Sequence, residues 1–239
     1  MHIASPFQIP LRLHWSFLGL YAGIVGYGAW LHGLTGALAF GAFALGAFAS
    51  VVLHELGHAL AARRYGIGTN HITLYPWGGV AAIEGMPEDP DQEIVIALAG
   101  PAVNFALAGI GGWAWLLFGQ QVLMAFVGAN LVMGVFNLIP AFPMDGGRVL
   151  RSVLAKWMGW DEASRVSLKI GRVFAWLFLA LSLPLKSPSL LLVGGFLHVA
   201  LNAERAQLVA RYWERTTGNP AWWRDGEGAS GSTCLVPRV

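Results

Sequence analysis

The chain contains few charged residues and almost no cysteine. Only 12% of its 239 residues are charged, whereas a soluble globular domain carries about 25%. Its one cysteine, Cys234, excludes an intrachain disulfide and a cysteine-rich metal site. The net charge of +2 is too small to indicate nucleic acid as a partner. These deficits argue against an ordinary soluble enzyme and against a nucleic-acid-binding protein.

What the chain has instead is apolar sequence. Hydrophobic residues make up 56% of it, and its mean hydropathy is +0.57. The 11 Trp and 31 Gly residues fit a membrane protein, because Trp favours the membrane interface and Gly lets membrane helices pack closely. The sequence therefore predicts an all-α polytopic membrane protein.

Six membrane spans can be drawn from length and polarity. They are predicted at residues 15–31, 35–63, 93–118, 122–140, 166–183 and 189–208. The uncharged stretches of the last two are only about a dozen residues long, whereas a spanning helix needs about 20. A re-entrant or interfacial hairpin therefore stays open as the alternative for these two segments.

Positive charge is distributed unevenly over the ends of these spans. If the N-terminus lies inside, the outer loops contain only Lys186. The inner ends then collect Arg12, Arg63, Arg64, Arg148, Arg151, Lys156, Arg165, Lys169, Arg172, Arg205 and Arg211. This bias predicts an integral, multi-pass protein whose N-terminus lies on the cytoplasmic side. We expect it in a prokaryotic cell membrane.

A different kind of sequence separates the second and third spans. Residues 69–84 mix β-branched and aromatic residues around a Pro-Trp-Gly-Gly break, which predicts two short strands and a turn. We therefore expect a small β-hairpin or sheet element between helices two and three. Residues 1–211 form one predicted domain. Residues 212–239 form a polar tail, which is expected to be disordered and to have no functional role.

One group of ionisable residues interrupts the second span. His54 and His58 are four residues apart, so a helix places both imidazoles on one face, where they can reach one metal ion. Glu55 can take a proton from a water that the metal activates. Chance, or a pair of core histidines, is the alternative. Ionisable residues are costly inside a membrane helix, however, and usually mark a functional site.

Asp145 is the candidate for a third metal ligand. A catalytic zinc usually has three protein ligands and one open position. Asp145 follows the fourth span, which ends on the same side of the membrane as the second. The prolines after Asn137 break the helix and the glycines after Asp145 permit a tight turn. The alternative is that Asp145 only caps a helix starting near Gly146.

Two asparagines are candidates for the active site. Asn104 follows a Gly-Pro pair in the third span, and Asn137 closes the fourth. An amide can donate to a developing oxyanion or hold an extended peptide. An interhelical hydrogen bond is the alternative for both, and it is the role we assign to Asn130.

These motifs together resemble the site-2 protease family of intramembrane zinc metalloproteases, peptidase family M50. The resemblance covers about residues 1–210 and is carried by His-Glu-x-x-His, by residues 137–147 and by the Gly-rich strand segment. It implies zinc bound by His54, His58 and Asp145, with Glu55 as general base and acid. It implies hydrolysis of a peptide bond within or beside a substrate's transmembrane helix.

The resemblance also favours catalytic roles for Asn104 and Asn137, and it implies that the strand segment pairs with an unwound substrate. Candidate substrate contacts are Ile72, Leu74, Gly78, Gly79 and Val80. An unwound strand in lipid would leave costly unpaired backbone groups, which addition to a β edge can satisfy. The expected partners are a transmembrane protein substrate and the lipid bilayer, with the active site on the cytoplasmic side.

Two non-enzymatic functions are the alternatives. A zinc carrier should have polar residues along several helices, whereas here they gather at one depth. A pseudoprotease that only binds membrane segments would not need Glu55. The sequence leaves the oligomeric state open.

Overall fold

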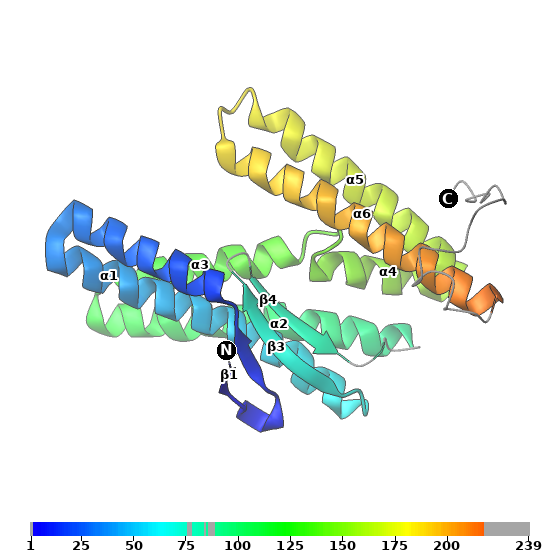
Figure 1. The fold of residues 1–239 in the computed structure, drawn as a ribbon, viewed down its shortest axis with the longest axis horizontal. Helices are drawn as coiled ribbons and strands as arrows, with labels where there is room; N and C mark the ends of the chain where they lie inside the picture. Colours follow the sequence, from blue (N-terminus) through cyan, green and yellow to red (C-terminus); the bar gives the residue numbers. More distant parts are fainter. Residues whose placement is uncertain (1, 76–77, 84, 86–88, 218–239) are drawn as a thin grey trace.

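The computed structural model describes residues 2–75, 78–83, 85 and 89–217, and this part of the chain is mainly helical with one small sheet (Figure 1). Its α-helices are α1 (Trp15–Arg64), α2 (Pro90–Phe118), α3 (Gln121–Asn137), α4 (Asp145–Met158), α5 (Trp160–Ser182) and α6 (Pro188–Thr217). Helix α6 continues past the domain boundary predicted at residue 211. The rest of the predicted tail lies outside the described residues.

Helix α1 is a hairpin of two arms rather than one straight helix. The backbone leaves the helical conformation at His32 and Gly33, and the φ of +60° at Gly33 is one that favours glycine. The arms correspond to the first two predicted spans (Figure 1). They touch at Gly28 and Gly36, because a Cβ on Gly28 would lie 2.6 Å from the carbonyl oxygen of Gly36. Two glycines therefore set the closest approach of the arms.

The other helices follow the predicted spans with shifted ends. Helix α3 ends at Asn137 and not at residue 140, since the following Pro140 has no backbone donor and cannot continue a helix. Helix α5 begins at Trp160, earlier than the predicted residue 166. Helix α4 was not among the predicted spans. It is amphipathic and it buries Arg151. The sequence analysis had included this residue among the positive charges at the inner ends of the spans.

Helices α2 and α3 pack beside α1, while α5 and α6 form a second hairpin that packs on α4 (Figure 1). The core of this second region joins the α3–α4 linker to the hairpin. It contains Ala141, Phe142 and Met144 from the linker, Leu168 and Ala175 from α5, and Leu197 and Leu201 from α6. Burial of the linker fixes the position from which α4 begins.

The sheet has the strand order β1-β2-β3-β4, with β1 at His2–Ala4, β2 at Leu11–Leu13, β3 at Thr69–Tyr75 and β4 at Gly78–Ile83. Strands β3 and β4 form the hairpin predicted within residues 69–84, although Pro76, Trp77 and Glu84 lie outside the described residues. The sequence analysis missed β1 and β2. Strand β2 runs parallel to β3, so the predicted hairpin forms one half of a larger sheet. Strand β4 is an edge of this sheet and packs on α1.

Candidate metal centre

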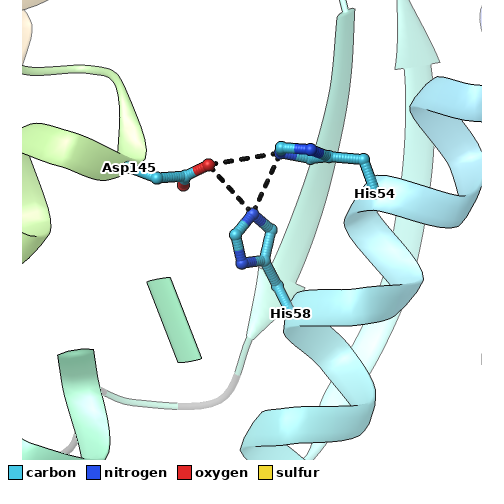
Figure 2. Close-up of side chains that lie close together, drawn as sticks. All are labelled: His54, His58 and Asp145. Atoms are coloured by element: carbon cyan, nitrogen blue, oxygen red, sulfur yellow. Dashed lines mark hydrogen bonds and ion pairs between the residues drawn. The ribbon is translucent and has the colours of Figure 1, made fainter. Parts of the chain in front are cut away.

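Three side chains from two helices point toward a common centre (Figure 2). The Nε2 atoms of His54 and His58, one turn apart on α1, lie 3.1 Å from each other. Each also lies 3.2 Å from Oδ2 of Asp145. All three residues are buried. The structure thus brings together the three residues that were predicted as metal ligands.

Asp145 is also the first residue of α4, so the helix start considered as the alternative exists as well. The residue at the cap position is Met144, which leaves the Asp145 carboxyl free to face the histidines. The two following glycines let this turn pack tightly. A Cβ on Gly147 would lie 2.5 Å from the amide nitrogen of Phe142, and one on Gly146 would overlap the carbonyl of Leu138.

A hydrogen bond shows which nitrogen of His58 carries the proton. Its Nδ1 lies 2.7 Å from the carbonyl oxygen of Ile96 in α2. A carbonyl oxygen can only accept, so Nδ1 of His58 donates. In a neutral imidazole the other nitrogen, Nε2, then carries a lone pair, which is the form that binds a metal.

The same conclusion for His54 follows from a buried amide network. Nδ2 of Asn130 donates to the carbonyl of Phe126 at 3.0 Å and to Oγ of Ser50 at 3.1 Å. Its Oδ1 therefore accepts from Nδ2 of Asn104, at 3.0 Å. The remaining oxygen of Asn104 lies 2.6 Å from Nδ1 of His54, which must donate. Nε2 of His54 is left with the lone pair.

These protonation states leave three lone-pair atoms facing one another. The donor atoms all lie within 4.8 Å of each other. Oδ2 of Asp145 is buried and has no hydrogen-bond partner within the described part of the chain. Such a group is repulsive unless a cation lies among the three atoms. Two imidazole nitrogens and one carboxylate are the donor set of many catalytic zinc sites, in which a fourth position stays open, so the arrangement fits zinc.

Gly100 of α2 provides the space for the two imidazoles. A Cβ at this position would lie 2.5 Å from Cε1 of His58 and 2.7 Å from Nε2 of His54. The orientation of each ring is fixed, because Nδ1 of each histidine is hydrogen-bonded to α2. The backbone of α2 therefore forms one wall of the centre. The sequence analysis did not identify this glycine.

Glu55 faces strand β4 as well as the three donor residues. Its carboxylate lies near the backbone of Ala81 in β4, and it lies close enough to the donor residues to interact with them electrostatically. A Cβ on Gly79 would lie 2.5 Å from Cγ of Glu55. The edge strand therefore packs directly on the predicted general base.

The predicted substrate contacts divide between two strands. Gly78, Gly79 and Val80 lie in the edge strand β4. Ile72 and Leu74 lie in β3, which pairs with β2 on one side and β4 on the other, and their side chains are buried. The prediction was wrong for Ile72 and Leu74, because only an edge strand has backbone groups left to pair with a substrate.

The structure bears differently on each of the three asparagines. Asn104 is buried and both its polar atoms bind protein partners, so the oxyanion role predicted for it was wrong and it supports His54 instead. Asn137 donates from Nδ2 to the carbonyl of Met133 at 3.0 Å, and its catalytic role stays a prediction. The interhelical hydrogen bond expected for Asn130 is confirmed.

Ser50 is a member of this network that the sequence analysis missed. It lies four residues before His54 and eight before His58, so all three share one face of α1. That spacing is a signal that could have identified it. The carbonyl of Ile96 has no counterpart in the sequence pattern, because any residue supplies a backbone carbonyl.

Comparison with known proteins places this geometry in a family. The family model for peptidase family M50 matches residues 42–129 and 116–179. The chain is 35% identical over 201 residues to a zinc metalloprotease of Methanocaldococcus jannaschii, covering 82% of this chain and 58% of that protein. It is also similar to the solved structure of a site-2 protease from Methanocaldococcus jannaschii, with a TM-score of 0.66 and 33% identity over 85% of this chain and 94% of that chain.

The chain therefore belongs to peptidase family M50, and the resemblance to site-2 proteases drawn from its motifs is confirmed. Zinc as the cofactor is confirmed as well, by the zinc metalloprotease among its relatives and by the convergent donors. The chain spans 58% of the length of that relative.

Proposed function

We propose that this protein is an intramembrane zinc endopeptidase that hydrolyses a peptide bond in or near the transmembrane segment of a membrane protein. The observation that supports this most is the position of Glu55, which lies between the convergent donors and the edge strand β4. In the proposal His54, His58 and Asp145 hold the zinc. When bound, zinc activates a water molecule and polarises the scissile carbonyl.

The chain's own residues supply the proton transfers and the alignment. Glu55 takes a proton from the attacking water and passes it to the leaving amine. Its close packing against Gly79 keeps the carboxylate beside the strand that would hold the substrate. Asn104 and the carbonyl of Ile96 orient the two imidazoles. Asn137 remains a candidate contact for the substrate or the developing oxyanion.

Substrate binding is proposed at the free edge of β4. A peptide bond in a helix has a shielded, hydrogen-bonded carbonyl, so the substrate must unwind before water can attack. Unwound backbone in lipid needs new partners, and an edge strand supplies them by strand addition. Gly78 and Gly79, with no side chains, let another backbone approach closely.

The proposal includes six membrane spans formed by the two arms of α1 and by α2, α3, α5 and α6. Helices α1 and α2 are each long and apolar enough to cross a membrane, and α3 is a shorter apolar helix. Helices α5 and α6 fall below that measure, but both expose large apolar side chains. These are Val173, Trp176, Leu177 and Leu181 on α5, and Leu191, Leu192, Phe196 and Val199 on α6. The bias of Lys and Arg toward one side favours a cytoplasmic N-terminus and active site.

The test is cleavage of a model single-span substrate by the full-length protein in lipid vesicles. The wild type, the wild type with a zinc chelator, and Glu55→Gln are compared, and the zinc content of each is measured. We expect cleavage only by the untreated wild type, while Glu55→Gln keeps its zinc. Equal cleavage by Glu55→Gln would refute the mechanism. A wild type that holds zinc but cuts no membrane substrate would favour a non-enzymatic zinc protein.

A further inference from the structure

A carboxylate is completely buried in α2 outside the metal centre. Glu93 has a relative exposure of 0%, and it lies one helical turn before Ile96, whose carbonyl binds His58. A buried carboxylate is costly unless it is paired and hydrogen-bonded. Neither the proposed chemistry nor the predicted substrate site uses this group, so its burial needs another explanation.

The partners of Glu93 all belong to α4, the helix that begins with Asp145. Oε1 of Glu93 accepts from Nη2 of Arg151, and Oε2 accepts from Oγ of Ser152. Both partners are buried. Nε of Arg148 lies 3.5 Å from Oε1 as well. One carboxylate in α2 therefore binds three side chains on one face of α4.

Arg151 is held from several sides. Its guanidinium lies over the rings of Phe142 and Trp160, 5.2 Å and 5.6 Å from their centroids. Nη1 lies 4.0 Å from Oε1 of Glu204 in α6. Glu93 and Glu204 thus face this guanidinium from two different helices. The charge is enclosed by the packing of α2, α4, α5 and α6, and α4 cannot turn or slide without breaking the contact to Glu93.

These contacts give α2 a connection to each of the three donors. Asn104 binds His54 and Ile96 binds His58, while Glu93 binds α4 about two turns after Asp145. We propose that Glu93 is a positioning residue of the metal centre, which fixes α4 through Arg151 and Ser152 and so holds the Asp145 carboxylate against the histidines. The inference rests on the proposed ligand set.

The same two helices are joined by a second ion pair, which provides a matched control. Asp91 of α2 binds Nζ of Lys156 near the end of α4. The Asp91 side chain is 73% exposed, and exposed ion pairs contribute little. Asp91→Asn changes the charge by the same amount as Glu93→Gln and removes an ion pair between the same two helices. It leaves the buried contacts of Glu93 to Arg151 and Ser152 in place.

The experiment measures zinc affinity by competition with a chromophoric chelator, using the purified full-length protein. The absorption spectrum of the cobalt-substituted protein is recorded in parallel, because its visible bands report ligand geometry. We expect Glu93→Gln to weaken zinc binding by about 10- to 100-fold and to alter the cobalt bands. Ser152→Ala, which removes one hydrogen bond, should cause a smaller loss in the same direction. Asp91→Asn should leave both readouts unchanged.

Asp145→Ala separates a failure of this inference from a failure of the ligand set. If Asp145→Ala binds zinc as tightly as the wild type, the ligand set is wrong. If Asp145→Ala loses zinc but Glu93→Gln retains wild-type affinity and spectrum, the positioning role is overturned. An equal loss in Asp91→Asn would overturn it too. If Glu93→Gln does not fold, Ser152→Ala decides, and a wild-type spectrum and affinity in that variant refute the proposal.

Discussion

The side-chain oxygen of Asn104 accepts a hydrogen bond from Nδ1 of His54 at 2.6 Å, and the amide nitrogen of the same side chain binds Asn130. The imidazole is thus oriented by a residue on a different helix, whose own orientation is fixed by a third helix. Such outer partners set the tautomer and basicity of a metal ligand. The centre therefore depends on α2 and α3, although neither helix supplies a ligand.

Asn104→Leu should weaken zinc binding by about 10- to 100-fold. Leucine has a similar shape but cannot accept a hydrogen bond from Nδ1 of His54, so the ring is free to turn or to change tautomer. Zinc affinity measured by chelator competition checks this. Asn70→Ala, at an exposed position in β3, is the control and should bind zinc normally. Full zinc affinity in Asn104→Leu would contradict the role assigned to the buried amide network.

Gly100→Ala should abolish zinc binding in a protein that still folds. The added methyl would lie 2.5 Å from Cε1 of His58 and 2.7 Å from Nε2 of His54, so both rings must move. Gly109→Ala makes the same change in the same helix, at a position with nothing within 4 Å, and should keep its zinc. Metal content after purification distinguishes the two. Equal metal content would show that the rings can shift without losing the ion.

Gly79→Ala should slow peptide hydrolysis while zinc affinity stays normal. A Cβ here would lie 2.5 Å from Cγ of Glu55, so the carboxylate or strand β4 must be displaced. Because a misplacement of about 1 Å can cost about 100-fold in rate, kcat/KM should fall by a factor of this order. The metal content of the same sample is the internal control. Unchanged hydrolysis would mean that Glu55 does not depend on its contact with β4.

Gly28→Ala should destabilise the protein by about 1–3 kcal/mol, the usual cost of overpacking. The methyl would lie 2.6 Å from the carbonyl oxygen of Gly36 and force the two arms of α1 apart. Gly23→Ala, in the same arm with nothing within 4 Å, should be neutral or slightly stabilising because alanine favours helix. Unfolding in detergent, followed by circular dichroism, measures both. A Gly28 variant as stable as the Gly23 variant would contradict the close contact.

The two histidines could be assigned from sequence because the spacing that unites them is local. Four residues make one helical turn whatever surrounds the helix. Asp145 required one further step, the count of spans that returns the chain to the same side of the membrane. Counting the spans correctly predicted that Asp145 lies near His54 and His58, although the helix that begins at Asp145, α4, had been considered only as the alternative.

What the sequence could not supply are contacts between distant segments. Leu11 of β2 pairs with Ile72 of β3, although the two arms of α1 separate these residues in the sequence. No local pattern indicates which strands will be neighbours. For this reason Ile72 was placed at a free edge that it does not have. Asn104 was assigned to the substrate because its bond to His54 depends on how α1 and α2 cross. Arg151 was counted only among the positive charges at the inner ends of the spans, since no local sequence pattern indicates that Glu93 is its partner.

The parallel pairing of β2 with β3 has a practical consequence for handling the protein. The segment before α1 is a structural neighbour of the strand that supports β4, and the backbone amide of His14 donates to the carbonyl of Leu74 at 3.0 Å. Trimming residues 2–13 would leave β3 with a bare flank and a ready surface for self-association. Affinity tags and fluorescent fusions therefore belong at the far end of the polypeptide, away from the sheet that borders Glu55.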